Sequence, residues 1–154
     1  MTTSSDTFLE HQRRLSNHRR PMLHPLLRLL ITPILRYDVE GLENVPDTGP
    51  TLLLGNHISF FDPTYITAAI DTRYVISMAK SEVLDDTFSS LMLHTWGNFV
   101  VNRENIDREA LKQAIGLIED NQLVWIAAEG TRNPEGMQEA KNGAAYIAYK
   151  ANAV

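Results

Sequence analysis

Residues 51–63 read TLLLGNHISFFDP, and this stretch decides how the rest of the chain is interpreted. The apolar run Thr51–Leu54 predicts a short buried strand that ends at Gly55. Asp62, followed by proline, predicts the N-cap of a helix over Thr64–Ile70. The stretch therefore predicts a strand, a loop and a helix in succession.

His57 and Asp62 lie at the two ends of that loop, with four residues between them. On a continuous α-helix, two such positions would point about 140° apart, so the side chains can meet only if the chain turns. If they meet, the carboxylate fixes the tautomer of the imidazole and stabilises its protonated form, which suits a proton-transferring group. The alternative is that Asp62 only caps the helix and His57 is an ordinary loop residue.

Apolar strand-like segments alternate with helical segments along the rest of the chain. The alternation predicts an α/β fold, with a largely parallel sheet flanked by helices. In such parallel sheets, ligands gather at the carboxyl ends of the strands. The expected strands are Tyr37–Glu40, Tyr74–Met78, Phe99–Val101 and Leu123–Ala127, and the expected helices are Ser81–His94, Asp107–Asn121 and Ala140–Ala151.

Residues 1–36 differ in charge from the remainder, residues 37–154. The net charge of the chain is −5, yet the first 36 residues hold six arginines against two acidic residues, a balance of +4 that leaves −9 for the rest. An acidic body disfavours nucleic acid as a partner. The chain has no cysteine, which excludes disulfides and thiolate nucleophiles.

Two helices, Thr7–Asn17 and Pro21–Leu35, are expected in this basic segment, with a break near Arg20. The apolar part is too short and too interrupted to span a membrane, which takes about 20 apolar residues. We expect the helices to lie in the membrane interface, with Arg13, Arg14, Arg19 and Arg20 at the lipid headgroups. The alternative is that they pack on the core of the domain.

Two further blocks follow predicted strands. Residues 97–103 read GNFVVNR, and residues 129–132 read EGTR. Their positions place Arg103 and Glu129–Arg132 on the same edge of the predicted sheet as His57. The alternatives are an ion pair of Arg103 with Glu104 or Asp107, and a simple polar turn at 129–132.

The three blocks, in this order, resemble those of the 1-acylglycerol-3-phosphate (lysophosphatidate) acyltransferase family of glycerolipid acyltransferases. In that family the blocks N-H-x4-D, G-x-F/I-x-x-x-R and F-P-E-G-T-R recur along one domain. The likeness covers about Val39 to Gly143. Ala127 and Ala128 replace the Phe-Pro of the third block. The family's fourth block, an apolar strand with paired prolines, is not found before Val154, so the C-terminal part of the domain is expected to be missing.

The resemblance implies a role for each block. His57 would be the general base that deprotonates the acceptor hydroxyl, with Asp62 orienting it. Outside the blocks, Lys80 and Lys141 are candidate contacts for the phosphates of an acyl carrier, and the alternative is that each is only a solvated charge. The acceptor's glycerol phosphate would be held by Arg103, Glu129, Gly130, Thr131 and Arg132.

The implied reaction moves a fatty acyl group from acyl-CoA or acyl carrier protein to a lysophospholipid, above all 1-acylglycerol-3-phosphate, to give phosphatidate. No metal and no cofactor are expected. The expected location is peripheral, at the cytoplasmic face of the cell membrane, with the lipid surface as a partner. The alternatives are another lysolipid or an ornithine lipid as acceptor, or an inactive or truncated membrane-binding fragment.

Overall fold

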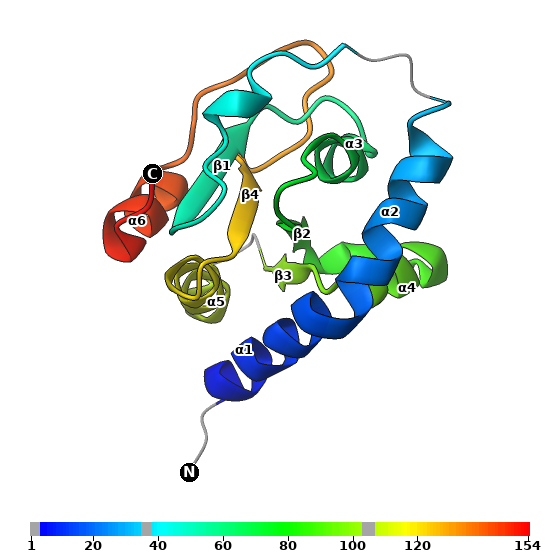
Figure 1. Ribbon diagram of the computed structural model, residues 1–154. Coiled ribbons are helices and arrows are strands. Elements are labelled where there is room, and N and C mark those ends of the chain that lie inside the picture. Colours follow the sequence, from blue (N-terminus) through cyan, green and yellow to red (C-terminus); the bar gives the residue numbers. More distant parts are fainter. Residues whose placement is uncertain (1–3, 35–37, 103–106) are drawn as a thin grey trace.

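The computed structural model describes residues 4–34, 38–102 and 107–154. A four-stranded sheet lies between helices (Figure 1), and every pair of neighbouring strands is parallel. This confirms the predicted α/β fold. In chain order the elements are α1 (Ser4–Arg14), the π-helical η1 (Leu15–Arg19), α2 (Arg20–Ile31), the 3-10 helix η2 (Leu42–Asn44), β1 (Thr51–Gly55), α3 (Asp62–Ala69), β2 (Val75–Lys80), the 3-10 helix η3 (Ser81–Asp85), α4 (Thr87–Trp96), β3 (Phe99–Val101), α5 (Arg108–Glu119), β4 (Leu123–Ala127) and α6 (Asn142–Ala151).

Strand β4 lies inside the sheet, whose order is β1-β4-β2-β3. All five of its residues are buried, as expected for a continuous apolar run covered on both faces. Val124 and Ile126 pack in the larger core with residues of α5 and α6. Trp125 packs in a smaller core that includes Ile66 of α3. Because successive side chains of a strand point to opposite faces, β4 joins the two helical layers.

Two predicted elements differ from those in the structure. Residues 38–40 form no strand, and Tyr37 lies outside the described residues. The helix predicted over Ser81–His94 is divided at Asp86, whose carboxylate accepts a hydrogen bond from the Ser89 N–H at 2.7 Å. Asp86 therefore caps a new helix, α4, because a side-chain oxygen at this position satisfies a free N–H of the first turn.

The N-terminal helices form one continuous helical run. The break predicted near Arg20 is wrong, because Arg20 has right-handed helical dihedrals and begins α2. Pro21 lies inside this continuous run, and because proline has no N–H it cannot donate the backbone hydrogen bond that its position would otherwise make. The irregularity is instead the π-helical turn Leu15–Arg19.

Arg20 joins this helical run to the end of α4. Its side chain is fully buried, with Nε donating to the Trp96 carbonyl at 3.0 Å and Nη2 donating to Oε1 of Gln12. The amide of Gln12 in turn donates to the Gly97 carbonyl at 2.7 Å. Burial disfavours the charged guanidinium and lowers the pKa of Arg20 to about 10. The expected contact of Arg20 with lipid headgroups is therefore wrong.

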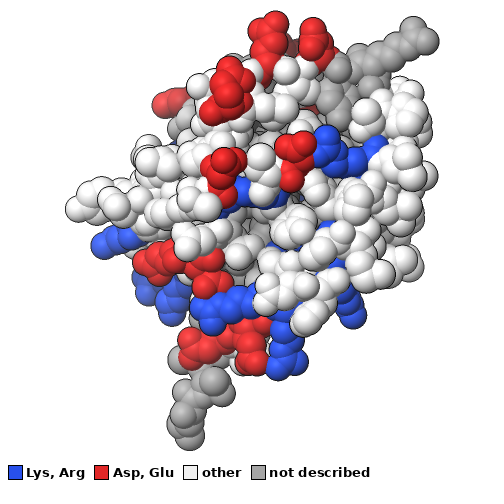
Figure 2. Space-filling model, in the orientation of Figure 1, with Lys and Arg blue, Asp and Glu red and all other residues white. Residues whose placement is uncertain are grey.

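The outer side of α2 is apolar. The right-hand side of Figure 2, where α2 lies in Figure 1, carries few charged side chains. Helices long and apolar enough to cross a membrane are absent from the described part of the chain. The large exposed apolar residues of α2 and the turn after it are Met22, Leu26, Leu29, Leu30 and Ile34.

Replacing Gly97 by alanine tests how closely the N-terminal helices pack on the end of α4. The φ of Gly97 is +87°, and a Cβ atom there would lie 2.2 Å from Cδ1 of Leu15. In Gly97→Ala, we expect the left-handed backbone to cost about 1–2 kcal/mol of unfolding free energy. The clash adds about 1–3 kcal/mol. Urea denaturation followed by circular dichroism measures the total.

Gly49→Ala is the matched control, because Gly49 has a φ of +95° and nothing within 4 Å of the added Cβ. This variant has the cost of placing alanine in a left-handed backbone conformation, but its Cβ atom meets no other side chain. Equal losses of stability in the two variants would contradict the close packing of Leu15 on Gly97.

Candidate active site

The candidate residues come together because β1 and β4 are adjacent and parallel. Gly55 at the end of β1 pairs with Ala127 at the end of β4. Beyond these ends, the Ala128 N–H donates to the Gly55 carbonyl at 3.0 Å, and the Asn133 N–H donates to the His57 carbonyl at 2.7 Å. The loop after β1 and the turn after β4 are therefore joined by backbone hydrogen bonds.

His57 and Asp62 are in direct contact. Nδ1 of His57 lies 2.9 Å from Oδ2 of Asp62, and each side chain is 18% exposed. The same carboxylate oxygen accepts the N–H groups of Ile58 at 2.7 Å and Ser59 at 2.8 Å. The chain therefore makes the turn that the spacing requires, and Asp62 points back into the loop. Its predicted role as N-cap of α3 is wrong, since Phe61 occupies the cap position without a side-chain hydrogen bond.

Three hydrogen bonds keep Asp62 ionised. Partial burial acts to raise its pKa, but the hydrogen bonds from His57, Ser59 and Ile58 outweigh burial, so the pKa lies below its usual value. A carboxylate with a lowered pKa stabilises the folded chain above the pKa of the unfolded state, and this stabilisation is lost as the pH falls through the folded pKa. The loop is therefore held most firmly at neutral pH.

The imidazole of His57 is also held from the side by an aromatic ring. The ring of Trp125, in β4, lies edge to face with it at a centroid distance of 5.8 Å. In the described part of the chain, Nε2 of His57 has no hydrogen-bond partner. A neutral imidazole that donates from Nδ1 has a free lone pair on Nε2, which is the arrangement required of a general base.

Among the described residues, Glu129 is the one acidic residue that is strongly buried. It lies two residues after the end of β4 and is 2% exposed. Neither of its carboxylate oxygens has a hydrogen-bond partner among the described residues. Buried polar groups without a partner are rare in folded proteins, and a role in binding or catalysis is one physical reason for them.

The remaining predicted site residues lie on the turn after β4 or outside the described residues. Gly130 has a φ of +68° and donates its N–H to the Ala127 carbonyl at 2.9 Å, which forms a tight turn after β4. Thr131 and Arg132 are exposed on that turn. Arg103 lies outside the described residues, although β3 before it ends at the same edge of the sheet.

Sequence reasoning placed Trp125 in the core but missed its contact with His57, and it missed Asn133. An aromatic residue midway along the central strand gave no signal of a site, because core positions have the same pattern. Asn133 acts through its backbone N–H, which carries no residue-specific signal.

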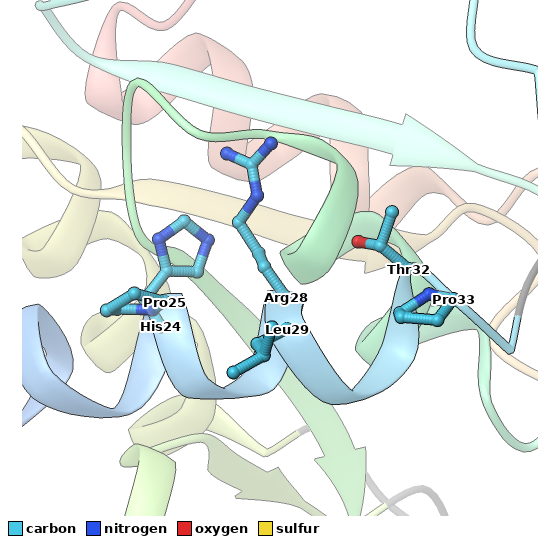
Figure 3. A pocket seen from close by; sticks show the side chains of 6 residues that line it. All are labelled: His24, Pro25, Arg28, Leu29, Thr32 and Pro33. Atoms are coloured by element: carbon cyan, nitrogen blue, oxygen red, sulfur yellow. The ribbon is translucent and has the colours of Figure 1, made fainter.

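A hollow of about 570 Å³ lies along α2 and is lined by residues of α2 and the turn after it (Figure 3). His24 and Arg28 extend from α2 towards the body of the domain, where His24 bonds the Thr67 carbonyl and Arg28 pairs with Asp71. None of its lining residues belongs to the three sequence blocks, so it is not the candidate site. Among the described residues, no group of three His, Asp or Glu side chains could hold a metal ion.

Comparisons with known proteins bear on the chemistry of this site. A family model described as an acyltransferase matches residues 36–154. A 1-acyl-sn-glycerol-3-phosphate acyltransferase of Borreliella burgdorferi is 33% identical over 100 residues, which are 64% of this chain and 40% of that protein. The beta form from Homo sapiens is 31% identical over 121 residues, which are 76% of this chain and 43% of that protein.

A third relative, from Streptococcus pneumoniae, carries the same name as the Borreliella protein. It is 29% identical over 136 residues, which are 82% of this chain and 50% of that protein. The chain thus spans half the length of these relatives or less. No solved structure matches the chain.

Proposed function

Because the chain belongs to the acyltransferase family, we propose that it transfers a fatty acyl group from a thioester to the free hydroxyl of 1-acylglycerol-3-phosphate. The donor is acyl-CoA or acyl carrier protein, and the products are phosphatidate and the free thiol. The observation that carries the proposal is the contact between Nδ1 of His57 and Oδ2 of Asp62, which leaves Nε2 available to a substrate. The names of the three relatives support the choice of acceptor.

In the proposed mechanism, Nε2 of His57 takes the proton of the acceptor hydroxyl as the oxygen attacks the thioester carbonyl carbon. Asp62 stabilises the imidazolium that forms. The tetrahedral intermediate then collapses, the carbon–sulfur bond breaks, and the imidazolium proton passes to the departing thiolate. The chain supplies no covalent nucleophile in this scheme, which agrees with the absence of cysteine.

The turn after β4 is the proposed acceptor site. Arg132 on that turn, together with Arg103, would bind the acceptor phosphate, because guanidinium groups match phosphate oxygens in pairs. Glu129 would accept hydrogen bonds from the acceptor or organise the cationic groups, and its unpartnered carboxylate supports such a role. Gly130 forms the tight turn, with the Lys141 side chain close to where a Cβ atom would lie, and Thr131 would donate from its hydroxyl.

Replacing the proposed base tests the reaction. We expect His57→Ala to lower acceptor-dependent thiol release from acyl-CoA by at least about 10²-fold, since a positioned general base contributes about 10²–10⁴-fold. Asp62→Asn should also reduce the rate, because the amide does not hold the required tautomer. Thiol release is followed with a chromogenic disulfide reagent, with and without lysophosphatidate.

His94→Ala is the matched control, because His94 is exposed near the end of α4. Its rate should equal that of the unchanged protein. Full activity in His57→Ala would contradict the proposal. Release that depends on another lysolipid or an ornithine lipid, but not on lysophosphatidate, would move the assignment to that acceptor. Vesicle binding without any thiol release would favour an inactive membrane-binding fragment.

The proposed location is peripheral, at the cytoplasmic face of the cell membrane, with α2 against the lipid. Leu26 and Leu29 are 51% and 69% exposed, and their neighbours on the outer side of α2 are apolar as well. The inner side carries the polar contacts of Arg20 and His24. A helix with one side fixed to a domain and an apolar outer side fits an interfacial position.

A charge on the outer side of α2 tests this location. Leu29→Asp should weaken binding to vesicles of phosphatidylglycerol and phosphatidylcholine by about tenfold or more, since burying one leucine contributes about 1.5–3 kcal/mol. Vesicle flotation measures the bound fraction. Tyr149→Asp is the control, because Tyr149 is 81% exposed on α6. Equal losses in the two variants would count against α2 as the lipid-facing element.

A further inference from the structure

Lys141 lies directly over the turn that carries the proposed acceptor site. It immediately precedes α6, and its backbone N–H donates to the Ala128 carbonyl at 2.9 Å. A Cβ atom at Gly130 would lie 3.0 Å from Cδ, 3.2 Å from Cε and 3.2 Å from Nζ of Lys141. The lysine side chain therefore runs across the space that only a glycine at position 130 leaves open.

This lysine belongs to the same edge of the sheet as His57. Ala128 is bonded to Lys141 through its carbonyl and to Gly55 through its N–H. Asn133, at the other end of the turn, is bonded to the His57 carbonyl. Backbone hydrogen bonds thus connect the loop of the proposed base, the turn of the acceptor site and Lys141.

The charge of Lys141 is not used by the fold. Lys141 is exposed, and no acidic side chain pairs with it within the described residues. In contrast, Arg13, Arg14 and Arg28 each form an ion pair with a carboxylate. A cation held over a ligand-binding turn without a counter-charge favours an anionic ligand there.

We propose that the ammonium group of Lys141 binds the phosphate of the acyl acceptor and selects phosphate-bearing acceptors over neutral ones. The proposal rests on the proposed function, because the acceptor site at residues 129–132 is part of it. It replaces the expectation that Lys141 contacts the acyl donor, since the side chain lies over Gly130 of the acceptor turn. A neutral acceptor would leave the ammonium unpaired beside the bound lipid.

The test compares Lys141→Met with Lys141→Arg. Methionine keeps an unbranched side chain over Gly130 without the charge, and arginine keeps the charge. We expect Lys141→Met to raise the KM for lysophosphatidate about tenfold, which corresponds to about 1.4 kcal/mol, with little change in kcat. The KM for a monoacylglycerol acceptor, which has no phosphate, and the KM for acyl-CoA should stay the same. Lys141→Arg should restore most of the affinity for lysophosphatidate.

Lys150→Met is the control, because Lys150 lies near the other end of α6, where its ammonium contacts the aromatic rings of Tyr146 and Tyr149. Equal acceptor KM values in Lys141→Met and Lys150→Met would overturn the proposal. A rise in the KM for acyl-CoA alone would assign Lys141 to the donor phosphates and would also overturn it. Thermal melting of each variant shows whether the fold is kept.

A binding measurement separates this proposal from the proposed reaction. Titration of glycerol 3-phosphate, followed by ³¹P NMR, should show weaker binding to Lys141→Met than to Lys150→Met. If the unchanged protein binds this phosphate through Lys141 but releases no thiol, the phosphate site stands and the acyltransferase reaction fails. If the reaction proceeds but the phosphate binds both variants equally, the role of Lys141 fails alone.

Discussion

The hydrogen bond between Nδ1 of His57 and Oδ2 of Asp62 is the contact on which the proposed chemistry depends. The same oxygen accepts two backbone N–H groups of the loop, so the orientation of the imidazole and the shape of the loop are set together. Because Asp62 is also the first residue of α3, the loop is anchored to a helix at one end and to β1 at the other. A base positioned in this way depends on the whole strand–loop–helix unit rather than on two side chains.

The parallel sheet brings the other groups to this base. β1 and β4 are far apart in the sequence but adjacent in the sheet, and Gly55 at the end of β1 pairs with Ala127 at the end of β4. Glu129 and the turn after it therefore lie beside the His57 loop. The N-terminal helices add a second constraint. Their inner side is fixed by the buried Arg20, while their outer side stays apolar and exposed. If α2 meets lipid, the buried contacts of Arg20 hold the sheet in a defined orientation to that surface.

Much of the fold could be predicted from the sequence, because apolar periodicity reports burial directly. The strands β3 and β4 have the predicted bounds, and β4 shows the continuous apolar run of a central parallel strand. The burial of Arg20 could not be predicted, since it depends on a contact with the distant Trp96 carbonyl, and the π-helical turn gave no signal in the apolar periodicity. For the site, the spacing of His57 and Asp62 predicted a turn, and the structure has that turn. The position of Lys141 depends on a backbone bond to Ala128, which has no sequence signature.

The most direct test of the central claim is the protonation of the His57 ring, measured by ¹H–¹⁵N NMR of the imidazole nitrogens. The account predicts that the neutral ring carries its proton on Nδ1, with Nε2 unprotonated, and that Asp62→Asn weakens this preference. A neutral ring with its proton on Nε2 would contradict the account, because the nitrogen that faces the substrate would then have no lone pair to accept a proton.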